Sequence, residues 1–154
     1  MKRDDKMTRP EKAKELFENG YNCAQAVFCA FEDVTGMEHE TALRFSAGFG
    51  GGMGRLREVC GAVSGMTMVL SCVFAGDPND QKKKKELYAL IQQAAGDFKA
   101  ENGSYICREL LGLSEKVSDP SPEARTKEYY KKRPCSELVE CAAKITEKYL
   151  NMNK

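Results

Sequence analysis

The sequence predicts an all-α protein, organised as a single-domain bundle of six to eight helices over residues 1–154. Apolar residues recur at helical spacing in successive segments, and capping residues, prolines and glycines separate those segments. No segment alternates between apolar and polar residues for long enough to indicate a strand. A chain of 154 residues can also bury a substantial core without disulfide bonds.

The first helices are predicted from their capping residues. Residues 1–7 are expected to form a flexible N-terminal segment. Thr8-Arg-Pro-Glu11 has the spacing of a capping box, so a helix is expected from here to Asn19-Gly20. Asn22 can cap a second helix, and a shorter third helix is expected over Glu38 to Ala47.

The fourth predicted helix, about Leu56 to Phe74, is apolar on nearly all sides. We therefore expect it to lie at the centre of the bundle. Gly61 and Gly65 are four residues apart and share one face of this helix. Without side chains they would let another helix pack closely against it.

Four more helices are predicted in the C-terminal half. Asp77-Pro78 is expected to start a long helix that ends at Asn102-Gly103. Ser104 can cap a short helix that ends before Gly112, and Ser121-Pro122 is expected to start a charged helix. The last helix follows Pro134.

Charge and hydropathy exclude several classes of partner. Lys and Arg number 24 against 23 Asp and Glu, a net charge of +1, which predicts neither nucleic acid nor an anionic membrane as a partner. No segment approaches the roughly 18 uninterrupted apolar residues of a spanning helix, so no membrane insertion is expected. The charged first residues lack the apolar stretch of a secretory signal, so we expect a cytoplasmic protein. The lysine run over 82–85 is expected to be a solvated surface.

Cysteine is the residue type that stands out. The chain has seven cysteines, one histidine and no CxxC pair. In a chain without an export signal this composition disfavours structural disulfides and favours metal binding or thiol redox chemistry. The single histidine, His39, lies between Glu38 and Glu40 and is expected to face solvent.

A glycine-rich stretch precedes the central helix. Gly50, Gly51, Gly52 and Gly54 could bring the backbone close to a phosphate, with Arg55 supplying positive charge. The stretch lacks both the GK[ST] ending of a Walker loop and the preceding strand of a dinucleotide site, which disfavours a nucleotide. A flexible connector, or a close approach to a helix, cofactor or partner, remains open. These five residues are the candidates for cofactor binding.

Four segments of the chain carry a family resemblance: GYNCAQA, GFGGGMG, CGAVSG and CRELLG, in this order. They resemble the family of redox-active proteins named for a CGAxxG motif and four cysteines, over roughly Ala13 to Cys135. The resemblance implies that the family's four cysteines are Cys23, Cys60, Cys107 and Cys135. A related module in split-Soret cytochromes associates it with iron–sulfur or electron-transfer chemistry. This chain lacks the CxxCH motif for haem attachment.

The local sequence singles out the same quartet, because each of the four cysteines lies early in a predicted helix. Their helix N-termini could meet in an electropositive setting that suits thiolates or an anionic cluster. Arg55 and Arg57 are expected to favour the Cys60 thiolate, and Arg108 is a weaker candidate beside Cys107. The other three cysteines would lie outside the family's set of four. Cys29 and Cys72 are expected to be buried as small apolar residues, and Cys141 is ambiguous.

Three chemistries compete for the quartet. An iron–sulfur cluster ranks first, with backbone amides of the glycine stretch approaching its sulfurs. Thiol–disulfide exchange, which needs only two thiols, ranks second, and a structural zinc site with four cysteine ligands ranks third. A non-catalytic helical module that binds a ligand or partner is the alternative function. An enzyme with a cysteine nucleophile ranks last, because no general base can be named. The redox partner is unknown, and a homodimer is possible.

Overall fold

The computed structural model describes residues 7–113 and 119–152, except for the side chains of 131 and 132. Over these residues the chain is all-α, with six helices of seven or more residues and no strand beyond one isolated bridge between Val59 and Ile106. The predicted fold class is confirmed. Residues 1–6 of the predicted flexible segment lie outside the described residues.

The longer helices are α1 (Arg9–Glu18), α2 (Cys23–Cys29), α4 (His39–Ser46), α6 (Gly61–Phe74), α7 (Gln81–Asn102) and α10 (Cys135–Met152). The short elements between them are α3 (Glu32–Thr35), the 3-10 turn η2 (Ala47–Phe49), α5 (Gly50–Met53), α8 (Cys107–Leu110) and α9 (Lys127–Lys132).

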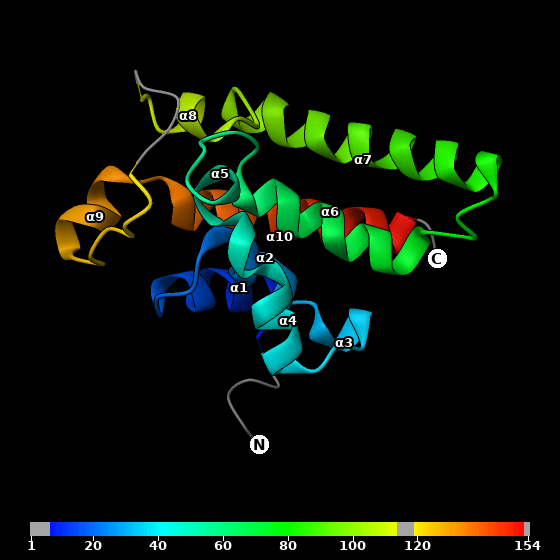
Figure 1. Cartoon of the computed structure of the whole chain (residues 1–154), viewed down its shortest axis with the longest axis horizontal. Coiled ribbons are helices and arrows are strands. Elements are labelled where there is room, and N and C mark those ends of the chain that lie inside the picture. The colour runs from blue at the N-terminus through cyan, green and yellow to red at the C-terminus, as the bar shows by residue number, and fades with distance from the viewer. Residues whose placement is uncertain (1–6, 114–118, 153–154) are drawn as a thin grey trace.

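Helix α6 lies at the centre of the bundle, as predicted. It packs against α2 and α10, while α1 packs against α10 and α2 (Figure 1). Helix α7 runs along one side of the α6 and α10 layer, and α1, α2 and α4 lie on the other side. The fully buried side chains of the core come from all these layers and include Phe17, Phe28, Phe31, Met66, Leu70, Phe98 and Val139.

The first two helices begin at the predicted caps. The Thr8 side chain accepts a hydrogen bond from the backbone of Glu11, and the Glu11 carboxylate accepts one from the backbone of Thr8. Asn22 and Gln25 form the same reciprocal pair at the start of α2. Each pair satisfies two backbone donors that a helix start otherwise leaves unpaired. The capping pattern therefore fixes where the residue after Asn22, Cys23, enters the fold.

Gly61 and Gly65 bring α6 against α2, as the sequence predicts. A Cβ atom on Gly65 would lie 2.9 Å from the carbonyl oxygen of Ala24, and one on Gly61 would lie 3.1 Å from the Ala24 nitrogen. The same atom on Gly61 would lie 3.2 Å from the Cβ of Cys23. The close crossing therefore also places the start of α6 beside Cys23.

The central helix begins at Gly61, five residues later than predicted. Arg55 and Arg57 have φ values of 63° and 61°, in the left-handed region, so residues before Cys60 cannot continue a right-handed helix. The chain pairs instead with the segment before α8. The Cys60 amide donates to the Tyr105 carbonyl at 2.8 Å, and the Cys107 amide donates to Glu58 at 2.6 Å.

Two later helices also begin after their predicted starts. Residues 77–80 form a turn, and α7 begins at Gln81 because the Asp80 side chain caps it through the Lys83 amide. The predicted helix start at Ser121-Pro122 is wrong. Helix α9 begins at Lys127, where the Thr126 hydroxyl accepts from the Tyr129 amide, and residues 119–126 are irregular.

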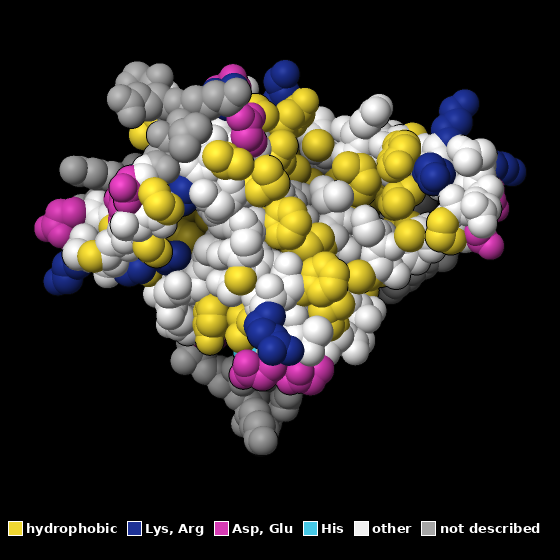
Figure 2. All heavy atoms as spheres, viewed as in Figure 1, with side chains coloured by type: hydrophobic (Ala, Val, Ile, Leu, Met, Phe, Trp, Pro, Cys, Tyr) yellow, Lys and Arg dark blue, Asp and Glu magenta, His cyan; other side chains and the backbone are white. Residues whose placement is uncertain are grey.

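The surface agrees with the expectation for the lysine run, whose side chains are exposed or half-exposed at the start of α7. Figure 2 shows hydrophobic side chains spread over the face that carries α4, α5 and α7. Among the described helices, none combines the length and the apolar character needed to cross a lipid bilayer. The cytoplasmic location, the single domain over 1–154 and the possible homodimer stay predictions.

Candidate functional site

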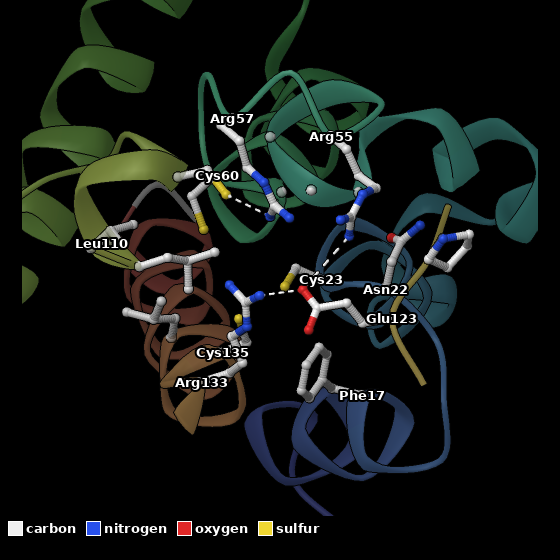
Figure 3. A pocket seen from close by; sticks show the side chains of 18 of the residues that line it. Phe17, Asn22, Cys23, Arg55, Arg57, Cys60, Leu110, Glu123, Arg133 and Cys135 are labelled. Carbon is white, nitrogen blue, oxygen red and sulfur yellow. Dashed lines mark hydrogen bonds and ion pairs between the residues drawn. The ribbon is translucent and has the colours of Figure 1, made fainter. Parts of the chain in front are cut away.

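The four cysteines of the predicted quartet line one cavity of about 380 Å³ (Figure 3). Each of them stands at the N-terminal end of a different helix. Three are first residues, Cys23 in α2, Cys107 in α8 and Cys135 in α10, and Cys60 immediately precedes α6 at its N-cap position. The structure therefore brings together residues that are up to 112 positions apart, where four helix N-termini meet.

Backbone pairing holds two of the thiols side by side. The hydrogen bonds that join Cys60 to Tyr105 and Cys107 to Glu58 run antiparallel around the Val59–Ile106 bridge. This pairing fixes the relative position of the starts of α6 and α8. It is a contact between segments nearly 50 residues apart, and no periodicity in the sequence indicates it.

The glycine stretch forms the wall beside Cys107. The predicted residues Gly50, Gly51, Gly52, Gly54 and Arg55 all line the cavity. Gly51 and Gly52 adopt φ values of 67° and 71°, and a Cβ on Gly52 would lie 2.7 Å from the Cβ of Cys107. Only glycine allows this approach.

Several amides of the stretch are already used within it. The Gly54 amide donates to the Gly48 carbonyl at 2.8 Å, and the Glu58 amide donates to Gly52 at 3.0 Å. The Arg55 and Arg57 amides likewise donate to carbonyls of Gly50 and Gly51. These four amides are therefore engaged within residues 48–58, and the approach of backbone amides of the glycine stretch to a cluster stays a prediction.

Arginines surround the thiols. Arg57 is only 4% exposed, and its Nη1 atom lies 3.6 Å from Cys107 Sγ. Arg125 and Arg133 also line the cavity but were not identified from the sequence. The one signal for them was the position of Arg133, two residues before Cys135. The cavity thus combines thiols with positive charge, which favours anionic sulfur species.

The segment of residues 119–125, which we call the strap, contributes side chains to the wall of the cavity. Glu123 forms ion pairs with Arg133 and, at 3.9 Å, with Arg55, and Figure 3 shows its carboxylate between these two side chains. Arg125 anchors the strap to the end of α1 by donating to the Phe17 and Tyr21 carbonyls, each at 2.9 Å.

Cys23 and Cys135 form a hydrogen-bonded pair with opposite properties. The Cys23 thiol donates to Cys135, which is the main cause that lowers the pKa of Cys135, and Arg133 and Arg125 lower it further. The same contact, together with burial, raises the pKa of Cys23. Of this pair, Cys135 is therefore the thiol whose ionisation the contact favours.

The prediction of a Cys60 thiolate is wrong for the protein as described. Burial raises the pKa of Cys60 to about 12, and hydrogen bonds from the Ala62 and Val63 amides only partly oppose this effect. The pKa of Cys107 is also raised by burial, despite its contact with Arg57. A helix N-terminus alone does not compensate for loss of water around a thiolate.

The remaining sequence candidates lie away from the cavity. Cys29 is buried as predicted, whereas Cys72 is exposed, so its predicted burial is wrong. Cys141 is half-buried and donates to Glu101 at 2.9 Å. Arg108 does not support a thiolate, because its Nη1 atom lies 3.2 Å from both the Glu58 carboxylate and the Arg57 carbonyl.

The spacing of the pocket thiols is wider than that of a compact metal site. Over the described part of the chain, no three of the four Sγ atoms form a set with all mutual distances within 4.8 Å. Tetrahedral zinc with Zn–S bonds of about 2.3 Å would require separations of about 3.8 Å between all four. The thiols would therefore have to move inward to hold a single zinc ion.

One of three comparisons with known proteins found a match. Searches of the curated proteins and of the solved structures each gave no significant match. A family model described as "Putative redox-active protein (C_GCAxxG_C_C)" matches residues 21–149, which include the whole quartet, the glycine stretch and the strap. Because this match covers most of the 154 residues, the chain belongs to the C_GCAxxG_C_C family.

Proposed function

We propose that this protein transfers electrons through an iron–sulfur cluster held by Cys23, Cys60, Cys107 and Cys135. The observation that carries the proposal is the convergence of these four thiols, from four helix N-termini, on one cavity. Thiol–disulfide chemistry needs two thiols, whereas the common clusters take four cysteine ligands.

The residues of the cavity suit such a group. A cluster bound by four thiolates is anionic, and the helix N-termini together with Arg57 and Arg133 supply compensating positive charge. Gly52 lets the backbone lie closer to Cys107 than any residue with a Cβ would allow. When bound, a cluster would accept and release single electrons. The protein would hold its ligands, exclude water through burial and tune its potential through the arginines.

Anaerobic reconstitution with iron and sulfide tests this proposal. We expect visible absorption together with bound iron and acid-labile sulfide, and we expect C60S or C107S to lose both. The variant C72S is the matched control, because Cys72 is an exposed thiol outside the cavity. A colourless, iron-free protein after reconstitution would overturn the proposal.

A second candidate function is thiol–disulfide exchange by Cys135 and Cys23, which the contact between these two thiols favours. The Cys135 thiolate would attack a partner disulfide, forming a mixed disulfide and releasing one partner thiolate, which takes up a proton. Cys23 would lose its proton and attack the Cys135 sulfur, releasing the second partner thiol. The partner disulfide gains two electrons, and the protein gains a Cys23–Cys135 disulfide.

Oxidation of the metal-free protein with glutathione disulfide distinguishes this candidate. Peptide mapping should find a disulfide between Cys23 and Cys135 that a dithiol reduces, and C135A should prevent it. Finding no intramolecular disulfide, or one that joins Cys60 to Cys107 instead, would rule out this pair as the exchange centre.

A further inference from the structure

A second cluster of possible metal ligands lies at the other end of α2, outside the cavity. It consists of Cys29, Glu32 and His39, whose ligand atoms all lie within 4.8 Å of one another. Cys29 is the last residue of α2, Glu32 the first of α3 and His39 the first of α4. Because a helix rises about 1.5 Å per residue, Cys29 lies about 9 Å along α2 from Cys23. The thiols of Cys23 and Cys29 therefore lie at opposite ends of α2.

The three ligands run from the core to the surface. The Cys29 side chain is almost completely buried, the Glu32 side chain is 21% exposed, and the His39 side chain is 47% exposed. His39 Nδ1 lies 2.6 Å from Glu32 Oε2. The Glu32 carboxylate also hydrogen-bonds with the Cys29 thiol, so it stands between the sulfur and the imidazole. One thiol, one carboxylate and one imidazole therefore face a common point that solvent can reach.

We propose that Cys29, Glu32 and His39 form a binding site for a zinc ion, with water as the fourth ligand. Thiolate, imidazole and carboxylate are the three ligand types that zinc takes in proteins, and three protein ligands with one open position is an established arrangement. With bonds of about 2.0 to 2.3 Å, the ligand atoms would lie about 3.3 to 3.6 Å apart. The imidazole nitrogen and the carboxylate oxygen, now 2.6 Å apart, would move apart by less than about 1 Å.

Zinc at this position would join the end of α2 directly to the starts of α3 and α4. Helices α3 and α4 are four and eight residues long, and α3 has no side-chain hydrogen bond at its N-cap. The metal would replace the proton of the Cys29 thiol and the contact between Glu32 and His39. It would fix the C-terminal end of α2, whose N-terminal end carries a pocket thiol.

His39 offers a direct probe because it is the single histidine of the chain. We would titrate zinc into the reduced, ¹⁵N-labelled full-length protein under anaerobic conditions and follow the imidazole signals by NMR. The signals should move to a new position and reach a plateau within about two equivalents, since the cavity thiols can also take up zinc. Imidazole signals that do not respond to zinc would overturn the proposal.

Variants separate this site from the cavity and from chance surface binding. C29A and E32Q should each weaken the response at His39 by about 10-fold or more in zinc concentration. C107S, which weakens the competing cavity site, should reach the same plateau at His39 with fewer equivalents of zinc. E40Q, which alters the neighbouring carboxylate, should respond as the wild type does. If both C29A and E32Q respond as the wild type does, the site is wrong. Should buried C29A fail to fold, the partly exposed E32Q decides alone.

Discussion

Cys135 and Cys60 occupy nearly the same kind of position, yet their environments have opposite effects. Both lie at a helix N-terminus in the same cavity, and both are nearly buried, at 8% and 4% exposure. The pKa of Cys135 is lowered, whereas that of Cys60 is raised to about 12.

The difference comes from the neighbours of each sulfur. Cys135 receives a hydrogen bond from Cys23 and has Arg133, Arg125 and Arg57 near it, whereas the leading effect on Cys60 is desolvation. A helix N-terminus contributes a partial charge that is worth about 0.3 to 1 kcal/mol, less than the cost of burying a thiolate. Hydrogen-bond donors and charged side chains near the sulfur therefore decide which pocket thiol ionises more readily.

The largest expected effect is selective alkylation of Cys135 in the metal-free, reduced protein. The pKa of Cys135 is lowered, whereas burial raises the pKa of Cys60 to about 12, so Cys135 has the larger thiolate fraction at pH 7. Allowing for the weaker nucleophilicity of a low-pKa thiolate, iodoacetamide should modify Cys135 about 30-fold faster or more at pH 7. Peptide mass spectrometry over time measures both rates, and equal rates would remove the distinction between the two thiols.

The second effect concerns the packing that buries Cys60. In G65A the added methyl group would meet the Ala24 carbonyl and the Val27 side chain, each at 2.9 Å, and force α6 away from α2. We expect the free energy of unfolding to fall by about 1 to 3 kcal/mol in urea denaturation. The matched control is G96A. Gly96 lies inside α7 with nothing near its missing Cβ, so alanine there should add about 1 kcal/mol of stability. Equal effects at both positions would contradict the close crossing.

The third effect tests the hydrogen bond between Cys23 and Cys135. C23A removes the donor, so the pKa of Cys135 should rise and alkylation at pH 7 should slow by about 5-fold. The alkylation rate should fall because a higher pKa leaves a smaller fraction of Cys135 as the thiolate at pH 7. C29A changes the other thiol of α2 and should leave the Cys135 rate unchanged. A faster reaction in C23A would mean that Cys23 shields Cys135 instead of activating it.

Much of this site could be predicted from local sequence. The capping boxes at Thr8 and Asn22 use residues three apart, and the pair Gly61 and Gly65 marks one helix face, so short-range patterns are sufficient. The family resemblance then identified the four cysteines that the fold brings together. These parts depend on residues that are near one another in the sequence, or on motifs that can be recognised from the sequence alone.

The parts that could not be predicted depend on long-range pairing or on unusual backbone conformation. Arg55 and Arg57 adopt left-handed conformations that their residue type disfavours, so α6 begins later than the sequence predicts. The strap carries Glu123 and Arg125 from a separate segment to the cavity, and nothing in its own sequence indicates that contact. The same holds for the cluster around His39, whose C-x2-E-x6-H spacing matches no standard metal motif.

The smallest expected effect comes from the charge beside Cys135. R133Q removes one of several positive charges, which ranks below the Cys23 hydrogen bond as a cause of the lowered pKa. Arg133 is also partly neutralised by its ion pair with Glu123. The midpoint of the pH–rate profile for alkylation of Cys135 should therefore rise, with a rate at pH 7 about 2-fold lower. R44Q, which changes an arginine outside the cavity, should leave the profile in place. If R133Q slowed the reaction more than C23A does, charge and not the neighbouring thiol would be the main reason that Cys135 and Cys60 differ.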